Sequence, residues 1–383
     1  MVYSFYVELK TELISKGKNA LSAADKFRHQ EKLRMDMKRD YYEDVQLFSS
    51  GVVAFWFCIL IVFLAAFPFL AKNYYVYVAN YMAINVIVVV GLNLLVGYTG
   101  QISMGHAGFF AIGAYATIVL MTKAHFPFLL ALPCGGLAAA LFGFLLGLPA
   151  LRLEGPYLAI ATLGFGITVT QIIGKIKMFG ERQGLHAPEL TIGSWHIETD
   201  KDFYFVLIPI TIFLVVIARN IVKTKVGRAF ISIRDADIAA ETMGVNLTFY
   251  KTMAFAVSAF YAGVGGGLYA FVLRFIEPEL FNMFMSVMFL TMAVVGGLGS
   301  MMGPVAGAGL LGLLDLQLRN ILEIPYIGQW IKALSESYFT MTGVSNIQLI
   351  IFGLILILIM LFEPLGIFGI WIRTKKYWRT WPF

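Results

Sequence analysis

Apolar runs long enough to cross a membrane recur along most of this sequence, and they constrain its fold more than any other feature. Hydrophobic residues make up 59% of the chain and charged residues 14%, which is far from the balance of a soluble globular domain. A run that crosses a hydrocarbon core of about 30 Å must be helical, because lipid offers no partner to a free backbone N–H or C=O. The sequence therefore predicts an all-α fold, a polytopic membrane helical bundle.

The hydropathy pattern predicts about ten transmembrane helices. Basic residues gather on the cytoplasmic side of membrane proteins, and here nine lie in residues 1–50, six between Arg219 and Lys251, and four after Trp371. All three segments, and with them both termini, are predicted to be cytoplasmic, since six spans precede the second segment and four follow it. The predicted spans cover residues 51–70, 75–96, 109–122, 126–149, 157–177, 203–221, 251–272, 284–298, 303–318 and 346–366.

Three parts follow from this topology. Residues 1–50 are predicted to form a cytoplasmic N-terminal extension, 51–372 the transmembrane domain, and 373–383 a cytoplasmic tail. The first apolar run begins only near Gly51, too far from the start for a signal peptide, so we interpret it as a retained span. A polar loop at about residues 222–250 divides the transmembrane domain.

The charged residues indicate contact with lipid. The formal net charge is +6, and the basic residues lie at span ends, which favours anionic inner-leaflet lipid over nucleic acid as a partner. In the N-terminal extension, an amphipathic helix from Ala20 to Val45 is one interpretation, and a solvated or partly disordered segment explains the same mixture of charges.

Two glycine-rich segments interrupt the apolar pattern in corresponding halves of the chain. The first reads GLNLLVGYTGQISMGHAGFF from Gly91, and the second reads VVGGLGSMMGPVAGAGLLGLL from Val294. Glycine adopts backbone angles closed to other residues, and nearby polar side chains can bond the backbone groups that a broken helix leaves free. Paired interruptions predict a transport site at a repeat interface. Close packing of helices through glycine explains the same residues equally well.

The candidate path residues lie in and beside these segments. His106 would act as a proton relay, a solute ligand or a helix cap, and Thr162 would either face the path or bond within its own helix. The histidines show no spacing typical of a metal site, so no metal is expected. The candidates for the translocation path are Gly97, Gly100, Gln101, Ser103, Gly105, His106, Thr162, Gly296, Gly297 and Gly299.

The sequence offers little to power transport. The predicted span cores hold hardly any acidic residue, which argues against coupling to a proton or sodium gradient. Asp315 is the exception, and DLQLRN is expected to be a helix end leaving the lipid, with Arg319 snorkelling. There is no G-x-x-x-x-G-K-[ST] loop for ATP phosphates, and no nucleophile, dyad or metal set at a credible spacing. We therefore expect neither an enzyme nor a cofactor, and energy must come from a partner.

The polar loop offers that partner a docking point. Residues from Asp235 to Met243 combine good helix formers with an acidic start, and Gly244 supplies a stop. A short helix parallel to the membrane would suit a soluble motor, although a solvated loop explains the charges as well. The residues expected to form this helix are Asp235, Asp237, Ile238, Ala239, Ala240, Glu241, Met243 and Gly244.

Four stretches between Tyr81 and Gly369 carry a resemblance to a known family. They read GLNLLVGYTGQISMGHAGFFAIGAYA, LRLEGPYLAIATLGFG, VGRAFISIRDADIAAETMGVN followed by AFAVSAFYAGVGGGLYA, and GGLGSMMGPVAGA. In order and spacing they resemble the signatures of branched-chain amino acid ABC importer permeases, the LivM-type subunit of the LivH/LivM family. The resemblance implies a multi-pass permease of the cell inner membrane that imports branched-chain amino acids or a related small polar solute.

The resemblance also implies partners. These are a second homologous permease (LivH-like), two cytoplasmic ATP-binding subunits that use the ATP, and an extracytoplasmic solute-binding protein. AAETMG, from Ala239 to Gly244, takes the place of the family's coupling segment. Interrupted helices with free N–H ends could receive the carboxylate of an amino acid without a dedicated Arg.

One segment departs from the family pattern. Where members commonly carry a Thr-Gly-Gly turn after the fifth span, this chain reads KMFGERQGLHAPEL, from Lys177 to Leu190. That segment should face the binding protein, so the departure leaves the solute open. Urea or a short amide is an alternative solute, and an ion-coupled secondary transporter or channel is an alternative mechanism.

Overall fold

The computed structural model describes residues 51–153, 155–193, 195–319, 353–359, 361–363 and 365–380. The chain divides into two compact units, residues 1–60 and 61–383, and only the start of α3 represents the first. The helix predicted from Ala20 to Val45 lies outside the described residues, as does part of the tenth predicted span.

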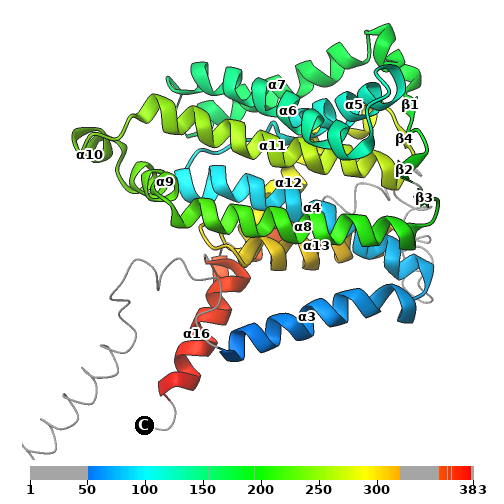
Figure 1. Ribbon diagram of the computed structural model, residues 1–383. Helices are drawn as coiled ribbons and strands as arrows, with labels where there is room; N and C mark the ends of the chain where they lie inside the picture. The colour runs from blue at the N-terminus through cyan, green and yellow to red at the C-terminus, as the bar shows by residue number, and fades with distance from the viewer. Residues whose placement is uncertain are drawn as a thin grey trace, which may run out of the picture. The chain divides into compact units, whose positions relative to one another are not determined.

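The described chain is mostly helical (Figure 1). Its helices are α3 (Gly51–Leu70), α4 (Asn73–Thr99), α5 (His106–Lys123), α6 (Phe128–Ala150), α7 (Pro156–Ile173), α8 (Asp200–Lys223), α9 (Lys225–Asp235), α10 (Asp237–Thr242), α11 (Leu247–Leu273), α12 (Met283–Gly296), α13 (Gly303–Arg319) and α16 (Gly366–Thr380). The short 3-10 turns are η1 (Lys177–Phe179), η2 (Glu181–Gln183) and η3 (Pro278–Leu280). Each of the first nine predicted spans coincides with one α-helix to within about four residues at either end, because long apolar runs leave few alternatives to a helix.

Several helices have the length and apolar character that a membrane crossing needs. Six helical segments of the described chain qualify, and the shorter apolar stretches Phe55–Leu70 and Gly303–Asp315 join them. The prediction of a polytopic helical protein is confirmed, whereas the count of ten crossings and the sides of the termini stay predictions. The six are Asn73–Thr99, Phe128–Ala150, Pro156–Ile173, Asp200–Lys223, Leu247–Leu273 and Pro278–Gly296.

Helices α4 and α11 form the centre of the bundle. The most apolar stretch of α4 is 94% buried and that of α11 is 78% buried, against 22% for α8. Around α11, glycine lets backbones meet: a Cβ on Gly113 of α5 would overlap the backbone of Gly263, and a Cβ on Gly266 would overlap that of Phe110. This close packing fixes the start of α5 against the middle of α11.

Four short strands lie at the end of the bundle opposite α10, which we call the strand end (Figure 1). Strand β1 (Leu185–His186) pairs antiparallel with β4 (Phe275–Ile276), and β2 (Leu190–Ile192) pairs antiparallel with β3 (Trp195–Ile197). The all-α prediction missed them, because strands of two or three residues leave no period in a sequence. The β1–β4 pair ties the loop after α7 to the loop after α11.

Candidate functional site

The first glycine-rich segment becomes an irregular stretch, residues 100–105, between α4 and α5. Gly100 ends α4 in the left-handed conformation with φ 72°, a backbone shape that glycine adopts without strain, and the Gln101 N–H donates to the Leu95 carbonyl at 3.2 Å. At 27 residues, α4 is long enough to cross a membrane by itself. The stretch therefore follows a complete helix and does not interrupt one.

This stretch leads into the interior of the bundle. At its start, Arg234 Nη1 on α9 donates to the Gly97 carbonyl at 3.0 Å. At its end, His106 Nε2 lies 2.7 Å from Ser258 Oγ, near the middle of α11. Both His106 and Ser258 are fully buried, so α5 begins deep inside the protein.

Buried hydroxyl groups occupy the polar atoms around the start of α5. Ser103 Oγ lies 3.1 Å from His106 Nδ1, so hydroxyls engage both ring nitrogens, and a ligand could bind neither without displacing a serine. The Met104 N–H donates to Thr162 Oγ1 at 3.0 Å, and the Ala107 N–H donates to Ser286 Oγ at 2.9 Å. The expectation of free N–H ends at this helix is therefore wrong for these two groups, because side chains already cap them.

Two candidates in this region differ in what they bond. Thr162 bonds within its own helix, because its Oγ1 donates to the Ala159 carbonyl at 2.9 Å, and the same Oγ1 accepts from Met104. That Thr162 faces the path stays a prediction. Gln101 is buried, and its Oε1 accepts no hydrogen bond within the part of the chain that the structure describes. A Cβ on Gly105 would overlap the Thr162 carbonyl, which places α7 directly against this stretch.

The second glycine-rich segment is a tight turn, residues 297–302, between α12 and α13. Gly297 and Gly299 have φ values of 116° and 74°, which favour glycine. The Gly299 N–H donates to Asn93 Oδ1 at 3.0 Å, while Asn93 Nδ2 donates to the Ser300 carbonyl at 2.8 Å. A Cβ on Gly296 would overlap the backbone of Gly303, so the two helices pack closely as an antiparallel pair.

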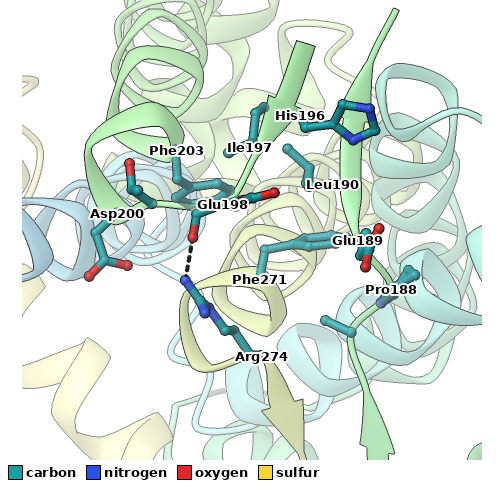
Figure 2. A pocket seen from close by; sticks show the side chains of 12 residues that line it. Pro188, Glu189, Leu190, His196, Ile197, Glu198, Asp200, Phe203, Phe271 and Arg274 are labelled. Carbon is teal, nitrogen blue, oxygen red and sulfur yellow. Dashed lines mark hydrogen bonds between the residues drawn. The ribbon is translucent and has the colours of Figure 1, made fainter. Parts of the chain in front are cut away.

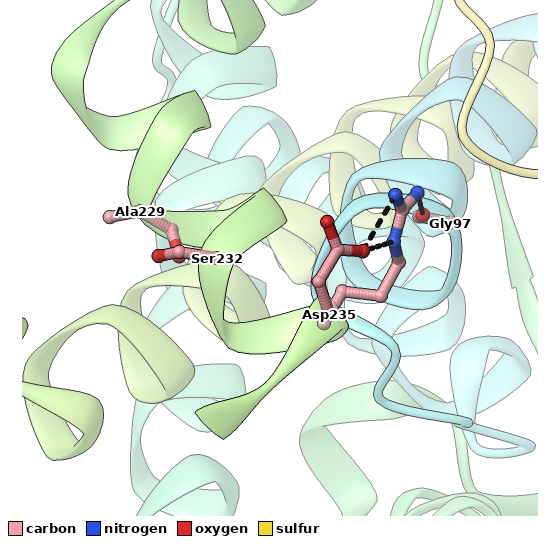
Figure 3. A network of polar contacts seen from close by, with 5 residues as sticks. Gly97, Ala229, Ser232 and Asp235 are labelled. Atoms are coloured by element: carbon pink, nitrogen blue, oxygen red, sulfur yellow. Dashed lines mark hydrogen bonds and ion pairs between the residues drawn. The ribbon is translucent and has the colours of Figure 1, made fainter. Parts of the chain in front are cut away.

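Both segments meet at Arg234, the contact that Figure 3 shows beside Gly97. A Cβ on Gly299 would lie 2.8 Å from Arg234 Nη1. Asp235 holds the other side of the guanidinium group, because its Oδ1 accepts from Nε at 3.1 Å and from Nη2 at 3.0 Å. We call Arg234, Gly97 and Gly299 the Arg234 junction.

A helix is present where the coupling helix was predicted, with a later start, and its coupling role stays a prediction. Asp235 is the last residue of α9, Ala236 is extended with φ −164° and ψ 98°, and α10 begins only at Asp237. The sequence misplaced the start because Asp235 pairs with Arg234, while Asp237 pairs with Lys251 at 3.5 Å. Of the other predicted members, Ile238, Ala239, Ala240 and Glu241 lie in α10, and Met243 and Gly244 follow it. Side chains of Ile238 and Met243 are 76% and 85% exposed.

The expectation for DLQLRN holds in part: the described part of α13 ends at Arg319, but Asp315 does not leave the bundle. This residue is fully buried in α13, and its carboxylate accepts a hydrogen bond from the Tyr81 hydroxyl of α4 at 3.1 Å. The charged residues of DLQLRN are typical of a helix end that leaves the lipid. In the structure, α13 packs along α4, and Asp315 lies in the interface between these two helices.

Two cavities at the strand end were not predicted. One, of about 520 Å³, lies between the β2–β3 pair and the ends of α8 and α11, and in Figure 2 Arg274 Nη2 donates across it to the Glu198 carbonyl at 2.6 Å. Phe203 and Phe271 form its buried apolar wall, and its carboxylates are those of Glu189, Glu198 and Asp200.

The other cavity, of about 320 Å³, lies between α7 and η3 and is called the α7 cavity below. The segment from Lys177 to Leu190, where the sequence departs from the family pattern, supplies Arg182 to this cavity and Glu189 to the larger one. That departure was the only sequence signal for these sites.

Comparison with known proteins decides the family. The model of the family described as "Branched-chain amino acid transport system / permease component" matches residues 74–360. The chain belongs to this permease family. It is 32% identical over 291 residues to the high-affinity branched-chain amino acid transport system permease protein LivM of Salmonella typhimurium (strain LT2), covering 69% of this chain and 68% of the relative. It is 33% identical over 294 residues to LivM of Escherichia coli (strain K12), with the same shares. No solved structure matches the chain.

Membership of this permease family establishes the setting of the site. The chain is a multi-pass permease of the inner membrane, in agreement with the six membrane-length helices among its described residues. A permease component is a transport subunit and not an enzyme.

Proposed function

We propose that this chain imports branched-chain amino acids as one permease subunit of an ABC importer, powered by ATP that separate subunits hydrolyse. The Arg234 junction carries the proposal. It bonds α9 to the end of α4 and touches the turn before α13, while α10, next along the chain, presents Ile238 and Met243 to solvent. A push on α10 is thereby passed to both glycine-rich segments.

The distribution of positive charge indicates which end of the bundle faces the cytoplasm. The Lys and Arg residues between Arg219 and Lys251 support a cytoplasmic position for the α10 end, and the strand end would then face outward. Exposed apolar side chains on a short, ordered helix suit a cleft on a soluble partner, and the two ATP-binding subunits supply such a partner. The outward cavities face the solute-binding protein.

Helix α7 is proposed to contact the second permease. Its side chains Tyr157 and Ile160 are 73% and 67% exposed, although Thr162 of the same helix is buried against the first glycine-rich segment. A path between two permeases would therefore have α7 as its wall on this side. Ile167, also on α7, borders the α7 cavity.

Uptake by the reconstituted transporter tests the proposal. Proteoliposomes holding this chain, its homologous permease, the ATP-binding subunits and the binding protein should accumulate leucine only with ATP and binding protein present. Uptake should persist when ionophores collapse the proton and sodium gradients. Uptake of urea in place of leucine would contradict the proposed solute. Leucine flux through the purified chain alone would contradict the proposed mechanism.

One observation favours an ion-coupled carrier as a second candidate. Asp315 is a fully buried carboxylate bonded to Tyr81, and such carboxylates serve as ion or proton sites in carriers. If Asp315 only holds α13 against α4, uptake by the Asp315→Asn variant should still depend on ATP, and an ion gradient should affect it no differently from the wild type. A gradient response that disappears in this variant supports the second candidate.

A further inference from the structure

We propose that the α7 cavity is a solute site in which Arg182 binds the carboxylate of an amino acid and Glu279 binds its ammonium group. The inference rests on the proposed function, because it names the groups by which this permease would hold its solute. It also identifies Arg182 and Glu279 as residues that determine specificity.

The size and lining residues of the cavity suit a zwitterion with an apolar side chain. Its volume of about 320 Å³ lies within the range of small-molecule sites, about 300–1,000 Å³. Among the described residues that line it, Arg182 is the one cation and Glu279 the one anion, and Ile167, Phe281 and Met283 add apolar surface. A guanidinium group matches a carboxylate in shape and charge, and a glutamate matches an ammonium group.

The backbone holds these two charges in place. Arg182 lies in η2 and Glu279 in η3, and the pairing of Leu185 with Ile276 in β1 and β4 brings the two turns together. Gly184, at φ 78°, allows this approach, because a Cβ there would overlap the Ile276 carbonyl. The two turns are therefore fixed against each other by backbone contacts and not by their charges.

The two charges remain available to a ligand. No ion pair joins Arg182 to Glu279 within the described chain, although both side chains are exposed and line the same cavity. A bound zwitterion would contact both, so that each of its charges meets the opposite one without a net charge entering the protein.

The cavity leads towards the first glycine-rich segment and stops short of it. It shares Ile167, Phe281 and Met283 with a void of about 10 Å³ that touches Met104 and Ala107 at the start of α5. That void is too small for an amino acid, since it holds about one water at most. The site is therefore a loading position, and α7 and α12 must separate before the solute can pass.

The larger cavity differs and serves as a control. Three of its lining residues carry carboxylates against the single guanidinium group of Arg274, which already donates to Glu198. Its charges do not form the one-to-one arrangement that a zwitterion needs. Arg274→Gln should therefore leave the choice of solute unchanged.

Solute analogues test the proposal in the complete transporter. Leucinamide lacks the carboxylate of leucine, and 4-methylpentanoate lacks its ammonium group. In the reconstituted wild type, uptake of leucine per binding-protein turnover should exceed uptake of either analogue by about tenfold or more. Arg182→Gln should lose discrimination against leucinamide alone, and Glu279→Gln against 4-methylpentanoate alone. Arg182→Lys keeps the charge and should retain most of the selectivity.

Each outcome separates this inference from the proposed function. Unchanged selectivity in Arg182→Gln and Glu279→Gln, with leucine uptake intact, overturns the site and leaves the importer standing. Absence of leucine uptake by the wild type overturns both. Basal ATP hydrolysis by the assembled complex reports folding. If Arg182→Gln does not assemble, Glu279→Gln carries the test, since unchanged discrimination against 4-methylpentanoate in that variant would contradict the site.

Discussion

Residues 100–105 and residues 297–302 both pass next to Arg234 and then follow different courses. The first stretch runs into the bundle and ends at His106, beside the middle of α11. The second turns back at once and joins two helices that pack antiparallel. Similar glycine patterns therefore serve two purposes. In the first region they let irregular backbone run between packed helices, and in the second they let two helices pack closely.

The polar groups differ in the same way. Around the first stretch, side chains from three other helices make the polar contacts: Thr162 and Ser286 accept from the backbone N–H groups of Met104 and Ala107, and Ser258 bonds the His106 ring. Around the second, Asn93 of α4 bonds both Gly299 and Ser300 and holds the turn as a rigid unit. We therefore expect the first stretch to change course during transport and the second to move with its helices.

The largest effect is expected where the second region packs. A Cβ on Gly307 would overlap the Met292 carbonyl, so Gly307→Ala should destabilise the protein by about 3 kcal/mol. On the same helix, a Cβ on Gly309 would meet only the tip of Met82 at 3.6 Å, so Gly309→Ala should be neutral or stabilise by up to about 1 kcal/mol. Unfolding of the detergent-purified protein measures both, and equal stability of the two variants would refute close packing here.

A smaller effect is expected at the junction that both regions share. Arg234→Gln removes the charged hydrogen bond to Gly97, a contact of about 2 kcal/mol, and solute moved per ATP hydrolysed should fall about tenfold. Lys225→Gln, an exposed change on the same helix, is the matched control and should transport normally. If both variants couple equally well, the junction transmits nothing.

The smallest effect is expected at the polar support of the first region. Thr162→Val leaves the partly buried Met104 N–H without its acceptor, so stability should fall by about 1 kcal/mol and the start of α5 should exchange amide hydrogens faster. Thr168→Val is the control on the same helix, because among the described residues Thr168 Oγ1 bonds only to the Gly164 carbonyl of its own helix, at 2.8 Å. Identical exchange at Met104 in the two variants would contradict the proposed support.

The helix positions could be predicted from the sequence, because a long apolar run in lipid satisfies its backbone hydrogen bonds by forming a helix. The same reasoning placed the glycine-rich segments without distinguishing them, since glycine permits both a backbone passage and close packing. Asp315 was misplaced for a related reason: which face of α13 meets α4 depends on packing and not on the local pattern.

The site was harder to predict than the fold. The α7 cavity joins Arg182 and Glu279 through the β1–β4 pairing, a contact between loops far apart in the chain. Strands of two residues give no periodic signal, so only the unusual segment from Lys177 to Leu190 drew attention to the region. The short helix α10 was predicted because a helix start and stop are local signals, although the Arg234–Asp235 pair shifted the start, and its coupling role stays a prediction.

The most direct test of the account follows motion from the cytoplasmic end into the bundle. Spin labels at Ile102 in the first stretch and at Tyr157 on α7, both exposed, would report their separation in the assembled transporter after Cys58 and Cys134 are replaced by serine. The account predicts that trapping the ATP-bound state changes this distance in the otherwise wild-type chain and that Arg234→Gln abolishes most of the change. An equal change with and without Arg234 would contradict the claim that the Arg234 junction carries the movement.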